Sequence, residues 1–196
     1  MSEGWHRNGE NDMKKKIMAM LLAMSMMILA TACGGGASFG AGSFGGPTYT
    51  NTSVGIKATM PDGFSEISGA AVTGITYEAV VQSEDGSAIQ IIAEDMKQTI
   101  GRAVSAKVYL DSMKEQVDTQ YGAMGLTTDT TDLGTVKIGG KDFDGISIAV
   151  TGGVQGLTQK YYISKVGDVM FCIITTATDD SAATLDQFIN SIEEAK

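Results

Sequence analysis

Residues 169–176 read Val-Met-Phe-Cys-Ile-Ile-Thr-Thr, an apolar run with the length of a single β-strand. Side chains alternate across a strand, so Phe171 and Ile173 lie on one face while Cys172 and Ile174 lie on the other. A strand that is apolar on both faces needs a covering layer on each side. The run therefore predicts a buried strand in one sheet that has helices on both faces.

Four glycine-containing turns divide the surrounding sequence into further strands. They are Asp85-Gly86, Gly139-Gly140, the segment 152–156 and Gly167-Asp168. Asp-Gly is a favoured type I′ turn pair, and connections this short make neighbouring strands antiparallel. Segment 152–156 lacks the Gly-Lys-Ser/Thr ending of a phosphate-binding loop and lies between strands, so we expect a hairpin loop. The strands predicted in this way are 77–82, 88–93, 136–138, 143–151, 157–166 and 169–176.

Two segments have the period of amphipathic helices. In residues 106–124 the apolar side chains recur at steps of three and four, with a serine before them as a cap and a glycine after them as a stop. Near the C-terminus, Asp180 or Ser181 caps a second helix that we expect to run to about Ala195. Both helices are expected to cover the sheet. Their apolar stripes are Leu110, Met113, Val117, Tyr121 and Met124 in the first helix, and Leu185, Phe188, Ile189 and Ile192 in the second.

The segment that opens the domain, residues 56–64, reads Ile-Lys-Ala-Thr-Met-Pro-Asp-Gly-Phe. It resembles the start of PsbP-like domains, in which a first strand runs into Pro-x-Gly and an aromatic residue. A long helix before a meander ending in Tyr161-Tyr162, followed by a C-terminal helix, is also similar to that family. The resemblance covers nearly all of residues 53–196. It implies an antiparallel α/β/α sandwich and no particular functional residue.

These patterns together predict an α+β fold. We expect an antiparallel sheet of about six to seven strands with helices on both faces. A domain of this size buries about two-thirds of the surface of its unfolded chain. We therefore expect that no cofactor is needed for stability.

Residues 13–33, MKKKIMAMLLAMSMMILATAC, have the layout of a secretory signal peptide. Three lysines at 14–16 form a positive region, and an uncharged apolar run follows from 17 to 29. This run is shorter than the roughly 20 residues that a membrane-spanning helix needs. We therefore predict a signal peptide rather than a transmembrane anchor.

The end of the apolar run, Leu29-Ala30-Thr31-Ala32-Cys33, resembles a bacterial lipobox, with Leu29 one place before the usual large aliphatic position. The resemblance implies that Cys33 is thioether-linked to diacylglycerol and becomes the mature N-terminus. Two acyl chains anchor a protein stably, at about 0.8 kcal/mol per buried CH₂. We predict a lipid-anchored protein on the extracytoplasmic face of the cell membrane, with Cys33 as the lipidation site.

These signals divide the chain into four parts. The first is polar and precedes the basic region, so Met13 is the better start. The third is rich in glycine and is expected to be a flexible tether, with Phe39 and Phe44 as isolated aromatic residues. The predicted parts are 1–12 (an extension), 13–32 (the lipoprotein signal peptide), 33–52 (the lipidated cysteine and tether) and 53–196 (one globular α/β domain).

The composition excludes several kinds of chemistry. The chain of 196 residues has a net charge of −9, which opposes binding to nucleic acid. Its only histidine, His6, precedes the signal peptide, so the mature protein has no Ser-His-Asp unit and no histidine-based zinc or copper site. Cys172 lies in an apolar strand, where we expect a small buried hydrophobe rather than a reactive thiol. We predict no cofactor and no catalytic residue.

Acidic pairs are the recurrent polar feature of the domain. Calcium takes about six to eight oxygen ligands, and residues 127–132, TTDTTD, come closest to an oxygen-rich cluster. We expect this segment to be an edge strand or a solvated loop, and we predict no metal site. The pairs are Glu84-Asp85, Glu94-Asp95, Asp129 with Asp132, Asp142 with Asp144, and Asp179-Asp180.

The sequence therefore predicts a non-enzymatic, lipid-anchored extracytoplasmic module that binds or supports another component of the cell envelope. The alternative is a lipoprotein that binds a small ligand or calcium. A large apolar pocket would favour the ligand, and a flat exposed apolar patch would favour a protein partner. The expected partners are the membrane, through the lipid on Cys33, and an envelope protein.

Overall fold

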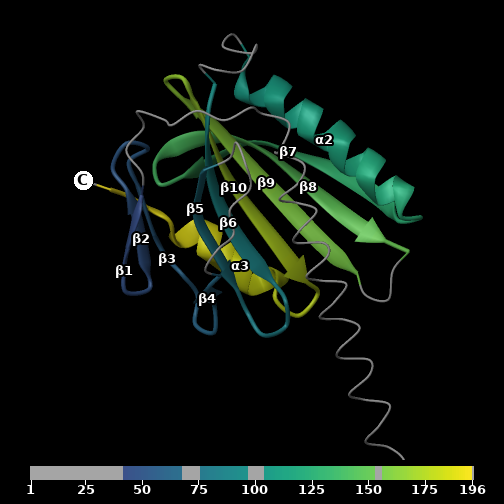
Figure 1. The fold of residues 1–196 in the computed structure, drawn as a ribbon, viewed down its shortest axis with the longest axis horizontal. Helices are drawn as coiled ribbons and strands as arrows, with labels where there is room; N and C mark the ends of the chain where they lie inside the picture. The colour runs from purple at the N-terminus through teal and green to yellow at the C-terminus, as the bar shows by residue number, and fades with distance from the viewer. Residues whose placement is uncertain (1–41, 68–75, 97–103, 153–155, 196) are drawn as a thin grey trace, which may run out of the picture.

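The computed structural model describes residues 42–67, 76–96, 104–152 and 156–195. These residues form two antiparallel sheets and two helices (Figure 1). The elements are β1 (Ser43–Gly45), β2 (Thr48–Asn51), β3 (Ile56–Thr59), β4 (Ser65–Glu66), β5 (Thr76–Gln82), β6 (Ala88–Asp95), α2 (Ala106–Ala123), β7 (Thr127–Ile138), β8 (Lys141–Thr151), β9 (Leu157–Val166), β10 (Val169–Thr178), α3 (Ala182–Ser191) and β11 (Glu193–Glu194).

The larger sheet has the strand order β4-β5-β6-β10-β9-β8-β7. Strands β7 to β10 form a meander, and β10 lies between β9 and β6, so that Cys172 pairs with Ile163 on one side and Ile92 on the other. The predicted hairpins at Gly139-Gly140, at 152–156 and at Gly167-Asp168 are confirmed. Residues 153–155 themselves lie outside the described residues.

Strand β10 is buried along its whole length, because each face of the sheet has its own core. Helix α2 lies across β7, β8 and β9 (Figure 1), and its apolar stripe packs with Met170, Cys172 and Ile174. On the opposite face, α3 contacts β10 and β3 and shares a core with Phe171 and Ile173. The predicted α+β fold, an antiparallel sheet with helices on both faces, is therefore confirmed.

The smaller sheet, in the order β1-β2-β3-β11, was not predicted. It lies beside α3 (Figure 1) and contributes Tyr49, which is fully buried, to the core on that face. Phe44, expected as an isolated aromatic residue of the tether, packs edge-on against Tyr49 with ring centroids 5.7 Å apart. The predicted tether over 33–52 is therefore wrong at its C-terminal end, and the folded domain begins before Ser53.

The two helices agree with the sequence to different extents. Ser105 caps α2 as expected, because its hydroxyl accepts the Val108 N–H at 3.3 Å. Helix α3 is shorter than predicted and ends at Ser191 instead of near residue 195. Ile192 is extended (φ −66°, ψ 126°), and Glu193–Glu194 then pair with β3. Strand pairing with a distant segment thus overrides the helical pattern.

The β5–β6 hairpin is confirmed, but its turn differs from the predicted type I′ pair. A type I′ turn needs positive φ at both central residues. Gly86 has a φ of 90°, whereas Asp85 has no positive φ. The Gly86 N–H donates to the Ser83 carbonyl at 3.1 Å, and the Ser83 N–H donates to the Ser87 carbonyl at 2.9 Å. The connection is therefore longer by one residue, with glycine in the left-handed region.

Candidate functional site

The predicted lipidation site, Cys33, and the signal peptide before it lie outside the described residues. The described part does contain the point at which the folded domain meets the predicted lipid-bearing segment, at Gly42. Neither helix of the described part combines the length and the apolar composition needed to cross a bilayer.

Three groups at the start of the domain converge on Glu78. This residue lies at a bulge in β5, and a bulge redirects a side chain. Glu78 Oε2 accepts hydrogen bonds from the Gly42 N–H, from the Tyr49 hydroxyl at 3.1 Å and from Asn51 Nδ2 at 3.4 Å. Burial, together with the Glu78 carboxylate, raises the pKa of Tyr49, so its hydroxyl remains a donor at neutral pH. The cluster fastens β1 and β2 to the larger sheet.

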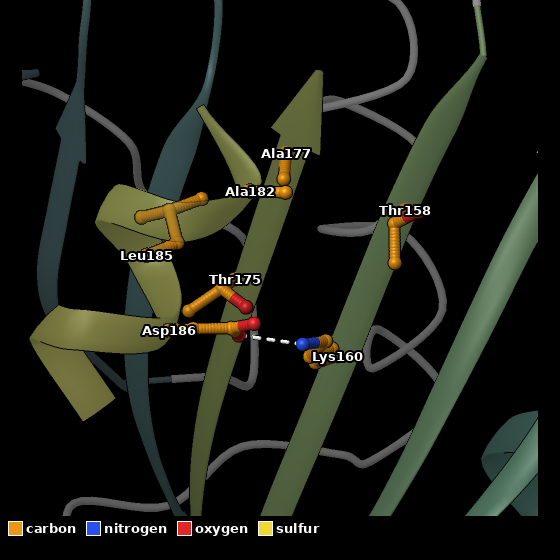
Figure 2. Close-up of a pocket in the computed structure, with 7 residues that line it drawn as sticks. All are labelled: Thr158, Lys160, Thr175, Ala177, Ala182, Leu185 and Asp186. Atoms are coloured by element: carbon orange, nitrogen blue, oxygen red, sulfur yellow. Dashed lines mark hydrogen bonds and ion pairs between the residues drawn. The ribbon is translucent and has the colours of Figure 1, made fainter. Parts of the chain in front are cut away.

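A hollow lies between α3 and the strands β9 and β10 (Figure 2). Lys160 and Asp186 point toward each other across it, with Nζ and Oδ1 2.5 Å apart. The hollow has a volume of about 190 Å³, part of it open to solvent, whereas ligand pockets occupy about 300–1,000 Å³. Its size suits ordered water better than an organic ligand. The residues that line it are Thr158, Lys160, Thr175, Ala177, Ala182, Leu185 and Asp186.

A hydroxyl network joins the β5–β6 turn to the start of α3. Asp85 accepts hydrogen bonds from the hydroxyls of Ser87 and Thr178, both at 3.1 Å, and from Ser83. Ser181 contacts Ser87 and Thr178 and therefore does not cap α3 through its side chain, contrary to one of the two predicted caps. Partial burial raises the pKa of Asp85, but the hydrogen bonds together outweigh it and hold the pKa below its ordinary value. The network is a structural link between two turns.

Glu94 is a buried acid on the face of the sheet that α2 covers, with 4% of its surface exposed. It accepts a hydrogen bond from the Tyr109 hydroxyl of α2, yet burial raises its pKa. Cys172 lies in the same core, and burial, reinforced by Glu94, raises the pKa of its thiol. The expectation that Cys172 is a buried hydrophobe is confirmed, because the side chain is fully buried and its thiolate is disfavoured.

The acidic pair in TTDTTD is separated by the fold. These residues belong to β7, the outermost strand, which confirms the edge-strand interpretation. Asp129 pairs with Ala149 on the α3 face of the sheet, whereas Asp132 pairs with Ile146, a core residue of the α2 face. The two carboxylates therefore point to opposite sides. Within the described ranges, no three histidine, cysteine, aspartate or glutamate side chains are grouped so as to hold a metal ion.

The remaining acidic pairs have ordinary surface partners or positions. Asp142 forms an ion pair with Lys137 at 2.6 Å, and Asp144 accepts a hydrogen bond from Thr135 at 3.4 Å. Asp179-Asp180 are exposed in the turn between β10 and α3. Among the described residues, none of these acids belongs to a group of three side chains that could hold a metal ion.

Neither Glu78 nor Asn51 was identified as important from the sequence, although their hydrogen bonds connect the start of the domain to the larger sheet. One signal was present for Glu78, which interrupts the otherwise strand-like run Tyr77-Glu78-Ala79-Val80-Val81 where the bulge lies. Asn51 lies in a polar segment with no pattern of its own, because its role depends on a partner that is distant in the sequence.

The fold is similar to that of solved structures. The solution structure of cyanobacterial PsbP (CyanoP) from Synechocystis sp. PCC 6803 matches with a TM-score of 0.50 at 15% identity, covering 82% of this chain and 98% of that chain. This chain has a PsbP-like fold. The resemblance expected from residues 56–64 and from the order of elements is thus confirmed for the fold alone, since a fold does not carry a function with it.

Two other similar structures come from different bacteria. A crystal structure from Bacteroides thetaiotaomicron VPI-5482 has a TM-score of 0.46 at 14% identity, covering 78% of this chain and 50% of that chain. LpqN of Mycobacterium tuberculosis, described as involved in cell envelope biogenesis, has a TM-score of 0.45 at 14% identity, covering 72% and 83%. No family model and no curated protein matches the sequence.

Proposed function

We propose that this protein is a non-enzymatic module that binds or supports another component of the cell envelope. In this proposal a lipid on Cys33 holds it on the extracytoplasmic face of the cell membrane. The signal peptide over 13–32 is removed, and Cys33, thioether-linked to diacylglycerol, is the mature N-terminus.

The short separation in sequence between Cys33 and the first described strand is the observation that carries this proposal. Strand β1 begins at Ser43, ten positions after Cys33. A backbone of that length spans at most about 35 Å, so a lipid on Cys33 keeps the folded domain at the membrane surface. Because Gly42 is hydrogen-bonded to Glu78, a pull on the anchor is transmitted directly to the larger sheet.

The environments of the polar groups favour binding over catalysis. The hydroxyls around Asp85 are bonded to one another, Glu94 is covered by α2, and the Lys160–Asp186 ion pair bridges the small hollow. A catalytic group, in contrast, must reach a substrate within hydrogen-bonding distance. These groups stabilise the fold and leave the outer surface for recognition.

Cell fractionation with cysteine variants tests the proposal. The wild-type protein should remain with the membranes through a high-salt wash, because two acyl chains hold it. Cys33→Ala should accumulate as an unprocessed precursor or as a soluble protein, whereas Cys172→Ala, the matched control, should behave as the wild type. A processed Cys33→Ala chain that stays on membranes in high salt would contradict the proposal.

A further inference from the structure

Strand β7 forms an outer edge of the larger sheet. It pairs with β8 on one side, and no strand of the described part pairs with its other side. An edge strand presents a row of backbone N–H and C=O groups without strand partners. Residues 127–131, Thr-Thr-Asp-Thr-Thr, hold a regular register with β8, and threonine favours extended backbone. The bulge between Asp132 and Gly134 ends that regular stretch.

The negative charge at residues 127–131 has no cationic partner in the described part of the chain. Asp129 is exposed and forms no ion pair with the described part of the chain. Asp118 of α2 lies over the same stretch and accepts a hydrogen bond from the Thr128 hydroxyl at 2.7 Å. Farther along, charged residues of β7 have partners. Asp132 of β7 pairs with Lys107 of α2 at 3.9 Å, and Lys137 of β7 pairs with Asp142 of β8 at 2.6 Å.

We propose that the edge of β7 over residues 127–131 receives an extended, lysine- or arginine-bearing segment of a partner protein as an additional strand. This inference rests on the proposed binding function and names its surface. Backbone hydrogen bonds to the added strand supply affinity, and side chains that alternate along it supply specificity. A cationic side chain opposite Asp129 supplies the missing charge partner, because opposite charges across two strands attract.

The same charge disfavours a second copy of this chain as the occupant. In a symmetric dimer, two β7 edges would pair as antiparallel strands. If all five residues of 127–131 pair, the central residue, Asp129, lies directly opposite Asp129 of the second copy. Like charges directly opposite each other destabilise a strand pair. A cation-bearing segment of a different protein therefore fits this edge better than self-association does.

The test uses the purified protein in a non-ionic detergent and a dye-labelled peptide that alternates lysine and threonine. Fluorescence anisotropy measures its affinity, with a peptide that carries glutamate in place of lysine as the matched control. Hydrogen exchange measured by mass spectrometry locates the binding. We expect the lysine peptide alone to bind and to slow the exchange of amides in 127–131.

Two charge reversals separate the edge from general attraction to an acidic protein. Asp129→Lys should weaken binding of the lysine peptide about tenfold, because an attractive cross-strand pair becomes repulsive. Glu115→Lys makes the same change of charge on the exposed surface of α2 and should change the affinity less than twofold. Asp129→Lys should also improve binding of the glutamate peptide.

Three results would overturn the inference. They are an equal loss of affinity in both variants, a lack of slowed exchange in 127–131, and a concentration-dependent dimer that protects these amides without peptide. The last result would make a second copy the occupant. None of these measurements depends on the lipid, so a failure here is distinct from a failure of the proposed anchoring.

Discussion

Glu94 and Asp85 lie in opposite environments, and their pKa values are shifted in opposite directions. Glu94 is buried under α2, and burial raises its pKa in spite of the Tyr109 hydroxyl. Asp85 is exposed on one side, and the hydrogen bonds from Ser83, Ser87 and Thr178 outweigh its partial burial and lower its pKa. The two carboxyl groups therefore contribute to stability in opposite ranges of pH.

Glu94→Gln is expected to stabilise the protein at neutral pH. Because the folded-state pKa of Glu94 is raised, its favourable contribution is complete below the unfolded value of about 4.3 and is lost as the pH rises through the folded value. A neutral amide avoids this loss and still accepts the Tyr109 hydroxyl. The free energy of unfolding in urea should rise by about 1 kcal/mol at pH 7 and change little at pH 4. A loss of stability at pH 7 would contradict this account.

Asp85→Asn is expected to have the opposite effect. The lowered pKa means that Asp85 stabilises the fold above its unfolded value of about 3.9 and loses this contribution as the pH falls through the folded value. The substitution should cost about 1 kcal/mol at pH 7, a small value because the carboxylate is partly exposed. Urea unfolding of Glu84→Gln, its exposed neighbour, is the matched control and should match the wild type. Equal effects of the two substitutions would show that the hydroxyl network adds nothing.

The β1–β2 hairpin is a structural part of the domain rather than the end of a tether. Tyr49 and Asn51 are fully buried, and both reach Glu78 in β5. Strand β3 has β2 on one side and β11 on the other, so the hairpin also covers one edge of β3. Removing it exposes the core that α3 shares with the smaller sheet.

A truncation pair tests the importance of this hairpin. A chain that begins at Gly42 should keep the stability of the longer protein, whereas a chain that begins at Ser53 loses Tyr49 and Asn51. The loss of a buried aromatic side chain alone costs about 3–5 kcal/mol, so the shorter chain should be severely destabilised or unfolded at 25 °C. Circular dichroism with thermal unfolding measures the difference. Equal melting temperatures would place the domain boundary at residue 53 after all.

Elements with a regular strand or helix pattern could be predicted from the sequence, and elements without such a pattern could not. Strands β8, β9 and β10 are long, alternate regularly or are wholly apolar, and follow one another through short turns. Strand β11 has two residues and pairs with β3, far away in the sequence, whereas β1 has three residues and pairs locally with β2 in a segment without a strand pattern. A run of Gly, Ser and Phe or a pair of glutamates carries no pattern of its own. The role of Glu78 could not be predicted for the same reason, because it depends on a bulge in β5 and on a hairpin that is distant in the sequence.

For the molecule as a whole, the charge of three lysines in the described part is balanced by acids. These pairs are Lys107 with Asp111, Lys137 with Asp142, and Lys160 with Asp186. An anionic leaflet attracts basic clusters at about 1 kcal/mol per Lys or Arg and repels acidic groups. The protein surface is therefore expected to add little to membrane attachment.

Vesicle sedimentation tests this expectation. A chain that begins at Gly34, and thus lacks Cys33, should remain in the supernatant with anionic vesicles at physiological salt. The lipid-bearing protein should sediment with the same vesicles and stay bound in high salt, because apolar burial is not screened. Strong, salt-sensitive binding of the shorter chain would reveal a basic face formed by folding.

Mass spectrometry of the mature N-terminus tests the proposed anchoring most directly. The protein purified from membranes should yield an N-terminal fragment that begins at Cys33 and carries the added mass of a diacylglycerol thioether. The start of strand β1, at Ser43, would then lie within about 35 Å of the lipid. A mature chain that begins after Cys33, or an unmodified Cys33 in the membrane-bound protein, would contradict the account.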